Sequence, residues 1–263
     1  MNNIFKKLKG ENLIKEHFEI AKKVCDDFKK YKSVKGIVIL GGIGRGYSDK
    51  YSDIDIIIFT EKKNKRIKEK VRKIWEEYKN KGIEVDIATT SLLEEEKKIW
   101  DNEAKFAYKI GKIIYYDPEN KIKKFLNKKI YYSKRERIKT IADAMLESEW
   151  LINCSDLWVY RGDIISAHYS INSAMEYLMK GIYTINGEFL PPHKWRIYLL
   201  KKFKIIDKNF MKKLKEVFKI KEFTIKELKR RKKIGKKLFE YILPFAENKV
   251  GVKFNEFYKF VYF

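Results

Sequence analysis

A glycine-rich segment between two short apolar runs places the strongest constraint on the fold of this chain. Residues 36–40 and 54–60 are almost entirely apolar and rich in β-branched side chains, which favours two buried β-strands. Gly41 and Gly42 follow the first run directly and predict a tight turn. After ten intervening residues, the acidic pair Asp53 and Asp55 flanks the start of the second run. The fold must therefore hold two carboxylates at a strand end beside a glycine turn.

The acidic pair predicts a metal site. Asp53 and Asp55 are two positions apart on a predicted strand, so both side chains emerge on the same face. Neighbouring carboxylates repel one another unless a cation lies between them, and Mg²⁺ suits a mixture of carboxylate and phosphate oxygens. Asp86, in a third predicted strand at 83–88, adds a third acid if that strand lies beside the second. Glu84 shares its face and is the competing candidate. We expect Asp53, Asp55 and Asp86 to bind one or two Mg²⁺ ions.

The glycine turn is the expected phosphate-binding element. Gly41 and Gly42 let the backbone approach an anion closely, and a helix that begins at about Ile43 would add its N-terminal dipole. Arg45 either contacts a phosphate or stays exposed on the first helical turn.

Hydrophobic periodicity divides the chain into two parts. Helical spacing at 11–31 and 63–81 alternates with the strands, and 112–116 predicts a further strand, which indicates an α/β arrangement. From about residue 134, long helical periodicities replace the strand signals. They run over roughly 134–160, 162–186, 193–203, 207–219 and 224–243. We expect an N-terminal domain at 1–130 and a helical domain at 131–263.

Charge and composition limit the classes of protein. The chain carries 60 Lys+Arg and 36 Asp+Glu, so its net charge is +24, which suits nucleotides, nucleic acid or an anionic membrane surface as partners. The alternative is a general lysine bias, because lysines occur along the whole chain. Residues 212–243 hold 13 basic residues and 4 Glu, which predicts either a solvated face or a surface for RNA.

The two cysteines and the apolar segments exclude other classes. Cys25 and Cys154 lie 129 positions apart, which excludes a disulfide scaffold and a zinc finger. A hydrophobic content of 44% excludes a disordered chain. The first residues lack the apolar core of a signal peptide, and no apolar segment is long enough to span a membrane. We therefore expect a cytoplasmic protein.

The helical half carries one polar stripe. His168, Asn172, Glu176 and Lys180 recur every four residues and share one face of a predicted helix. Such a stripe either faces water or faces a cleft, where Glu176 would serve as a general base for an acceptor hydroxyl.

These residues together resemble the nucleotidyltransferase superfamily that includes DNA polymerase beta. The form is closest to the antibiotic (lincosamide- and aminoglycoside-type) and minimal nucleotidyltransferases. The family signature is a hydrophobic residue with Gly-Gly or Gly-Ser, a short spacer, Asp-hydrophobic-Asp, and a later acid on a neighbouring strand. The elements that match it, in order, are Leu40-Gly41-Gly42, Asp53-Ile54-Asp55 and Asp86.

The resemblance implies an α+β fold, with a small mixed sheet and flanking helices followed by a C-terminal helical bundle that binds the acceptor. It implies that Gly41 and Gly42 hold the triphosphate, that Asp53 and Asp55 bind metal, and that Asp86 is a metal ligand or general base. Ile43 stands where many members have Ser, so that phosphate contact is either missing or supplied by Ser48.

Two shorter resemblances concern the helical half. Residues 183–195 are similar to a segment of the lincosamide-type enzymes, which implies that Lys194 reaches the triphosphate; the alternative is that it caps a helix. The spacing of Arg161 and His168 resembles that of HEPN-domain ribonucleases, in which such a pair would cleave RNA within a dimer.

The resemblance implies a Mg²⁺-dependent enzyme that transfers a nucleoside monophosphate to a hydroxyl or phosphate with release of pyrophosphate. ATP is the expected donor and a small molecule the expected acceptor, with RNA or protein acceptors and a homodimer left open. The alternatives are a non-catalytic, antitoxin-like protein of the same fold that binds RNA or a protein, and a HEPN-like ribonuclease.

Overall fold

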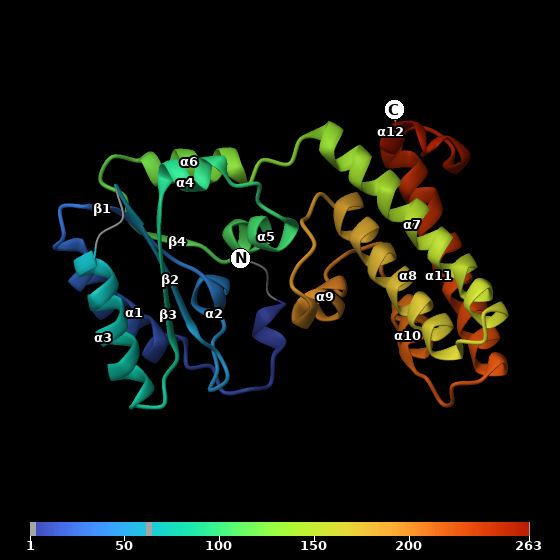
Figure 1. Ribbon diagram of the computed structural model, residues 1–263, viewed down its shortest axis with the longest axis horizontal. Helices are drawn as coiled ribbons and strands as arrows, with labels where there is room; N and C mark the ends of the chain where they lie inside the picture. The colour runs from blue at the N-terminus through green and yellow to red at the C-terminus, as the bar shows by residue number, and fades with distance from the viewer. Residues whose placement is uncertain (1–3, 62–64, 263) are drawn as a thin grey trace. The chain divides into compact units, whose positions relative to one another are not determined.

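The chain divides into two compact units, Met1–Tyr131 (unit 1) and Tyr132–Phe263 (unit 2). The computed structural model describes residues 4–61 and 65–262 (Figure 1). The predicted α+β class is confirmed, because unit 1 holds a small mixed sheet with flanking helices and the described part of unit 2 contains helices only. No helix in the described ranges is both long enough and apolar enough to cross a membrane.

The sheet of unit 1 contains four strands in the order β3-β2-β1-β4. β1 (Val34–Ile39) is antiparallel to both β2 (Ile54–Thr60) and β4 (Ile113–Tyr116). β2 and β3 (Val85–Ser91) are parallel, and α3 (Lys65–Lys79) lies between them in the sequence, as a parallel connection requires. The N-terminal ends of β2 and β3 therefore meet at one edge of the sheet, where the acidic residues lie.

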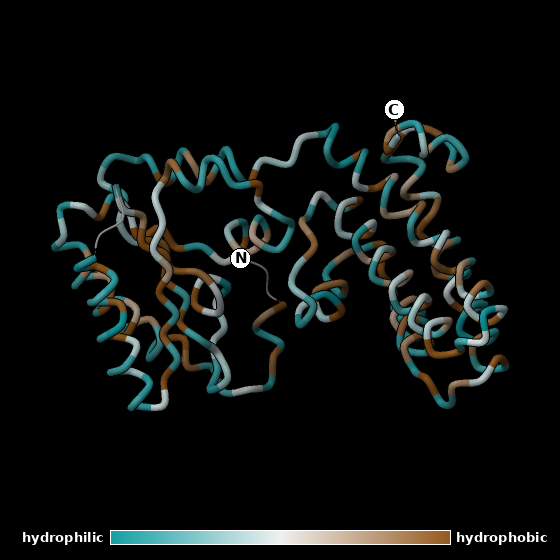
Figure 2. The backbone as a smooth tube through the Cα atoms, viewed as in Figure 1, coloured by the Kyte–Doolittle hydropathy of each residue, from teal (hydrophilic) through white to brown (hydrophobic). Residues whose placement is uncertain are grey.

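Helices cover both faces of this sheet. Side chains of α1 (Ile14–Lys29) and α3 pack on one face, against inward residues of β1 and β2 such as Ile37 and Ile56. The other face carries Val38 and Phe59, under residues of α5 (Asn102–Ile110) and α6 (Lys121–Lys129). Figure 2 shows hydrophobic colour along the strands, whereas the surrounding helices alternate. The remaining elements of unit 1 are η1 (Phe5–Lys7), α2 (Gly41–Arg45) and α4 (Leu92–Lys97).

Unit 2 is a bundle built on the hairpin of α7 (Lys134–Tyr160) and α8 (Ile164–Ile185). α7 begins with a capping box, in which Ser133 and Glu136 bond each other's backbone N–H. The aromatic tail packs against its own unit, since Phe257 is fully buried and Phe254 contacts Phe239. The other elements are α9 (His193–Leu200), α10 (Lys208–Phe218), α11 (Ile225–Val250), η2 (Phe254–Glu256) and α12 (Lys259–Tyr262).

The clearest difference from the expected elements is the length of α11. The sequence predicts a helix that ends at 243, before Pro244, yet α11 continues to Val250. Proline lacks the N–H for one helical bond, but Pro244 is exposed, so the carbonyl left without that bond can be solvated. Buried Ile242 and Ala246 hold the helix against the bundle on either side of it. Of the helix expected at 63–81, residues 63 and 64 lie outside the described residues.

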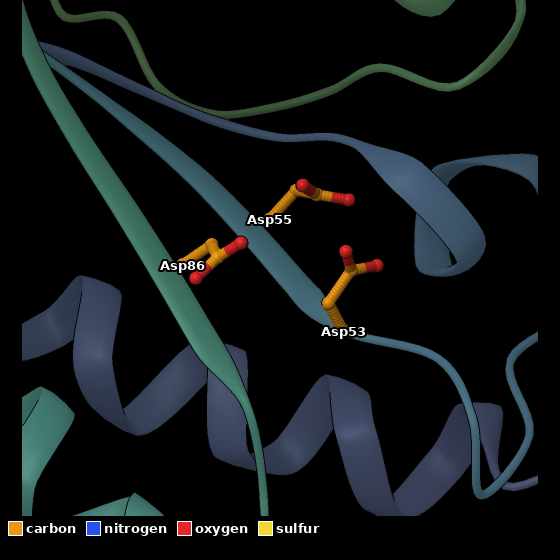
Figure 3. Close-up of side chains that lie close together, drawn as sticks. All are labelled: Asp53, Asp55 and Asp86. Atoms are coloured by element: carbon orange, nitrogen blue, oxygen red, sulfur yellow. The ribbon is translucent and has the colours of Figure 1, made fainter. Parts of the chain in front are cut away.

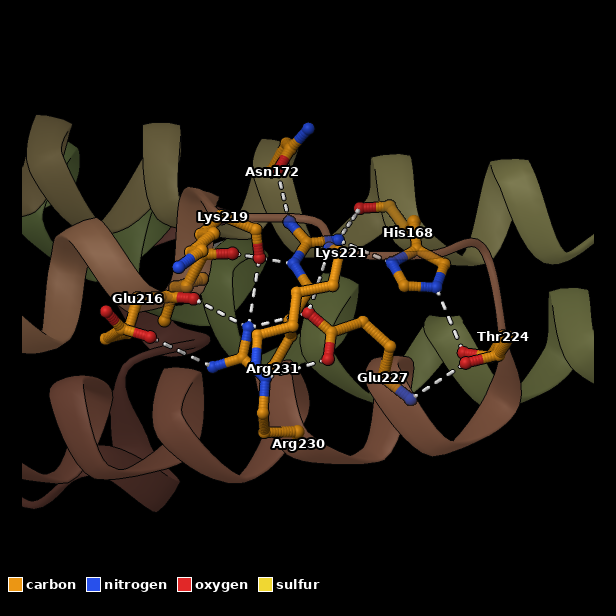
Figure 4. Close-up of polar contacts among 10 residues, drawn as sticks. His168, Asn172, Glu216, Lys219, Lys221, Thr224, Glu227, Arg230 and Arg231 are labelled. Carbon is orange, nitrogen blue, oxygen red and sulfur yellow. Dashed lines mark hydrogen bonds and ion pairs between the residues drawn. The ribbon is translucent and has the colours of Figure 1, made fainter.

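A buried arginine joins α8 to α10 and α11 (Figure 4). Arg231 has no exposed surface, and its Nε donates to the Val217 carbonyl at 2.6 Å. Its Nη1 lies 2.8 Å from His168 Nδ1, and its Nη2 donates to Asn172 Oδ1 at 2.5 Å. His168 Nδ1 must therefore accept, which leaves its Nε2–H to donate to the Thr224 carbonyl at 3.2 Å. The imidazole is neutral in this network.

Every member of the predicted polar stripe on α8 bonds another part of unit 2. His168 and Asn172 bond Arg231, Glu176 pairs with Arg196 at 2.6 Å, and Lys180 pairs with Asp143 at 2.7 Å. Each member of the stripe therefore joins α8 to another part of unit 2. These polar residues at helical spacing therefore make contacts within the bundle.

The same network argues against a HEPN-like ribonuclease. His168 is 1% exposed and both of its ring nitrogens are engaged, so it is not presented to an RNA substrate. Arg161 is exposed and lies over the Trp158 ring. We do not carry the Arg161 and His168 alternative further.

The stability of the fold is expected to fall as the solution becomes acidic. Burial, reinforced by the Arg231 charge and opposed by the bond to Thr224, lowers the pKa of His168 below its usual value of 6.5. The unfolded chain then binds a proton that the folded chain resists, so stability is complete above pH 6.5 and declines below it. Urea unfolding of wild type between pH 7.5 and 5.5 should show this decline. His168→Gln, which retains an acceptor for Arg231 but does not titrate, should reduce the slope; an unchanged slope would contradict the assignment.

Candidate active site

The parallel register of β2 and β3 brings the three predicted acids together (Figure 3). Asp55 lies directly opposite Asp86 in the pairing of the two strands, and Asp53 precedes Asp55 by two positions on the same face. One carboxylate oxygen from each residue lies within 4.8 Å of the others. Asp53 and Asp55 are half-buried, whereas Asp86 is exposed. The third strand therefore lies where the sequence argument required it.

The register also separates Asp86 from its competitor Glu84. Glu84 is two residues earlier on the chain, and its carbonyl accepts a hydrogen bond from Ile54 N at 3.0 Å. Its exposed side chain is not part of the acidic cluster that the described residues form. Asp86 is therefore the third carboxylate.

Gly41 fits closely against the acids. Leu40 N donates to the Asp55 carbonyl at 2.9 Å, which fixes the end of β1 beside the start of β2. Gly41 has a φ of +64°, a left-handed conformation that favours glycine, and a Cβ on it would overlap the Asp55 carboxylate. A side chain here would therefore strain the turn and displace a carboxylate.

The short helix α2 follows, and Gly42 and Gly44 are buried in it. A Cβ on Gly42 would lie 2.8 Å from the Tyr47 carbonyl, and one on Gly44 would overlap the backbone of Gly111 at the end of α5. The glycine turn is thus packed backbone to backbone against the segment that leads into β4.

This packing places a lysine near the turn that the sequence argument missed. Lys112 follows Gly111, and the next residue, Ile113, pairs with Ile39 at the end of β1. Ile114 packs on the face under α5 and α6, so strand alternation puts Lys112 on that face too, together with Asp55. Burial lowers the pKa of Lys112. In a chain with lysines everywhere, nothing in the sequence distinguishes it; only the strand order does.

Arg45 occupies the last position of α2, close to the acids. Burial lowers the pKa of Arg45, and the nearby charges of Asp55 and Asp53 oppose that effect. The guanidinium is therefore within electrostatic reach of both carboxylates.

Ser48 has a different environment from the one predicted for a phosphate ligand. Its side chain is fully buried, and its hydroxyl shares a hydrogen bond of 2.6 Å with His17 Nδ1. Its backbone N–H donates to Asn12 Oδ1 at 3.2 Å. These contacts tie the loop after α2 to α1, so we do not include Ser48 among the phosphate contacts.

Two predicted site residues belong to unit 2. Glu176 Oε2 lies 2.6 Å from Nη1 of the buried Arg196, whose Nε donates to the Pro191 carbonyl at 2.8 Å. Glu176 therefore serves as the counter-ion of a buried arginine. Lys194 is exposed in the first turn of α9. The roles of Glu176 as general base and of Lys194 as triphosphate contact stay predictions.

The acidic cluster fits a hard divalent cation. Its three donors are carboxylates, which Mg²⁺ prefers, and they converge on one face from two adjacent strands. Three like charges at this separation repel one another strongly, and a bound cation relieves that repulsion. Asp53, Asp55 and Asp86 are therefore the residues that would hold Mg²⁺.

Comparison with known proteins agrees with this geometry. Residues 19–144 match the nucleotidyltransferase domain family, a range that contains the glycine turn and all three acids. This part of the chain is a nucleotidyltransferase domain. The domain supports a general function in nucleotidyl transfer and implies a nucleotide substrate.

A solved structure of a nucleotidyltransferase-like protein from Exiguobacterium sibiricum 255-15 is also similar. The match covers 88% of this chain and 77% of that chain, with a TM-score of 0.44 and 10% sequence identity. No curated protein matches the chain.

Gly41→Ala should weaken metal binding, because the added methyl group overlaps the Asp55 carboxylate. Gly82→Ala is a matched control, since Gly82 also has a positive φ, of +72°, but open space around its Cβ position. Both variants should lose about 1–2 kcal/mol of stability from the left-handed conformation. Calorimetric titration with Mn²⁺ should show weaker binding for Gly41→Ala alone. Equal binding by the two variants would contradict the proposed fit.

Proposed function

We propose that this protein is a Mg²⁺-dependent nucleotidyltransferase that transfers AMP from ATP to a hydroxyl or phosphate acceptor and releases pyrophosphate. The convergence of Asp53, Asp55 and Asp86 within 4.8 Å carries the proposal. Bound Mg²⁺ supplies Lewis-acid polarisation of the phosphoryl oxygens and stabilises charge on the attacking and leaving oxygens. The nucleotidyltransferase domain that contains these acids supports this reaction class.

In the proposed reaction an acceptor oxygen attacks the α-phosphorus of the nucleotide. The bond from that phosphorus to the bridging oxygen breaks, and its electron pair leaves with pyrophosphate. The acceptor proton passes to a carboxylate oxygen of Asp86, the most exposed of the three acids. Most of the catalysis then comes from positioning and electrostatics, as expected for phosphoryl chemistry.

The glycine turn and two cations are the proposed contacts of the triphosphate. Gly41 has no side chain between its backbone and the Asp55 carboxylate, and Gly42 packs closely against the Tyr47 carbonyl. Arg45 follows on α2, and Lys112 lies on the same face of the sheet as Asp55. Lys112 thus offers a charge that compensates for Ile43, which occupies the position where Ser is common in the family.

Unit 1 is the proposed catalytic domain and unit 2 the proposed acceptor-binding domain. We favour a small-molecule acceptor, and RNA or protein acceptors are outcomes of a screen with α-labelled nucleotide. We propose ATP as the donor because of the resemblance, and titrations with GTP, CTP and UTP test that choice.

The three carboxylates should be indispensable for transfer. Asp53→Asn, Asp55→Asn and Asp86→Asn should each lower metal-dependent transfer about a hundredfold or more, because each removes a charge that the transition state requires. Glu84→Gln removes a neighbouring carboxylate outside the cluster and should retain activity.

Calorimetric titration of ATP with and without Mg²⁺ tests binding without an identified acceptor. Full metal-dependent binding in Asp53→Asn/Asp55→Asn would refute the site, and no nucleotide binding in wild type would favour a non-catalytic role.

Lys112→Gln should weaken binding of Mg²⁺·ATP about tenfold, which corresponds to the loss of one charge-assisted contact with a phosphate. Lys124→Gln, at an exposed position of α6, changes the net charge equally and should leave the Kd unaltered. AMP binding should be less sensitive to Lys112→Gln than ATP binding is. Equal Kd values for Mg²⁺·ATP in the two variants would remove Lys112 from the site.

A further inference from the structure

Five lysines form one exposed stripe along α11. They are Lys226, Lys229, Lys233, Lys236 and Lys237, all exposed to solvent. Successive members are one, three or four residues apart, so they share one face of the helix over about 17 Å. The opposite face of α11 carries buried Leu228, Leu238 and Ile242 and packs into the bundle. This lysine stripe is therefore fixed in place by a rigid helix.

The lysine stripe itself contains no acidic residue, and exposed Glu240 lies one turn beyond its end. In the part of the chain that the structure describes, none of the five ammonium groups makes an ion pair or hydrogen bond. Within the stripe, Lys229 and Lys233, and likewise Lys233 and Lys237, are four residues apart. Like charges at that spacing oppose helix formation. The five ammonium groups therefore repel one another, and a bound polyanion would reduce that repulsion.

General lysine bias does not account for this pattern. α3 is also rich in lysine and arginine, yet it carries Glu69, Glu76 and Glu77 among them, and Arg72 pairs with Glu76. Lys81, just beyond that helix, pairs with Glu77 at 2.6 Å. Where the chain places many lysines on α3 it interleaves acids, and on the exposed face of α11 from 226 to 237 it does not.

We propose that the lysine stripe of α11 binds the phosphate backbone of a double-stranded nucleic acid without reading its sequence. Complementary charge on a rigid, extended surface is what such binding requires. No exposed aromatic side chain lies within the stripe to stack on an unpaired base, which favours a duplex. An anionic membrane would require an apolar face open to lipid, and the apolar face of α11 is buried. The proposal does not depend on the nucleotidyl-transfer reaction.

The test compares two variants of the full chain with equal net charge. One replaces Lys226, Lys229, Lys233 and Lys236 by Ala, and the control replaces Lys65, Lys68, Lys73 and Lys79 of α3 by Ala. Alanine favours helices, so both should fold, and circular dichroism checks this. A third variant changes the four α11 lysines to Arg and retains the charge. The probes are RNA and DNA duplexes of twenty base pairs, titrated by fluorescence anisotropy at several salt concentrations without nucleotide or Mg²⁺.

Wild type, the control and the Arg variant should bind with similar affinity, whereas the α11 Ala variant should bind at least about tenfold more weakly. On DNA its dependence of log K on log salt should be shallower by up to about 3.6, because each of the four lost phosphate contacts removes about 0.9. The RNA and DNA arms show which duplex is preferred. Equal weakening in the α11 and α3 Ala variants, or no binding by wild type, would overturn the proposal. Because no nucleotide is present, neither result bears on the transfer reaction.

Discussion

Mutual repulsion among three carboxylates is the constraint around which unit 1 is built. Asp53, Asp55 and Asp86 cannot be moved apart without breaking the parallel pairing of β2 and β3, since Asp55 and Asp86 are opposite one another in that register. The sheet offsets the repulsion among the carboxylates, because apolar residues such as Ile54 and Ile56 are fully buried beneath them and stabilise the fold. A stable core thus maintains an arrangement that is electrostatically unfavourable until a cation binds.

The backbone around the acids is equally constrained. Gly41 contacts the Asp55 carboxylate, and Gly44 contacts the backbone of Gly111, so the glycine turn is confined between β2 and the end of α5. Chain segments far apart in the sequence therefore determine the shape of the turn jointly. That same packing brings Lys112 to the face where Asp55 lies, and it connects the metal site to the proposed phosphate contacts without any further element.

Local signals in the sequence predicted most of unit 1, because each strand is a distinct apolar run and glycines follow β1 and α3. The Asp86 position followed from the same logic once β3 was placed beside β2. Local patterns could not show contacts between residues distant in the chain. The ion pair of Glu176 with Arg196 and the hydrogen bond of Ser48 with His17 are of this kind. Pro244 is tolerated within α11 because it is exposed, which the local sequence does not show either. No local sequence pattern distinguishes Lys112 from the other lysines.

Asp86 belongs to β3, which is an outer strand of the sheet, and its side chain is open to solvent. An acidic site at such a margin can accept partners of very different size, because no neighbouring strand limits their approach. It is equally open to water, which is itself a hydroxyl compound and competes for the same phosphorus. In the proposed reaction, a nucleotide bound at the acids would therefore be exposed to hydrolysis. Transfer would prevail over hydrolysis only where the acceptor displaces water as it binds.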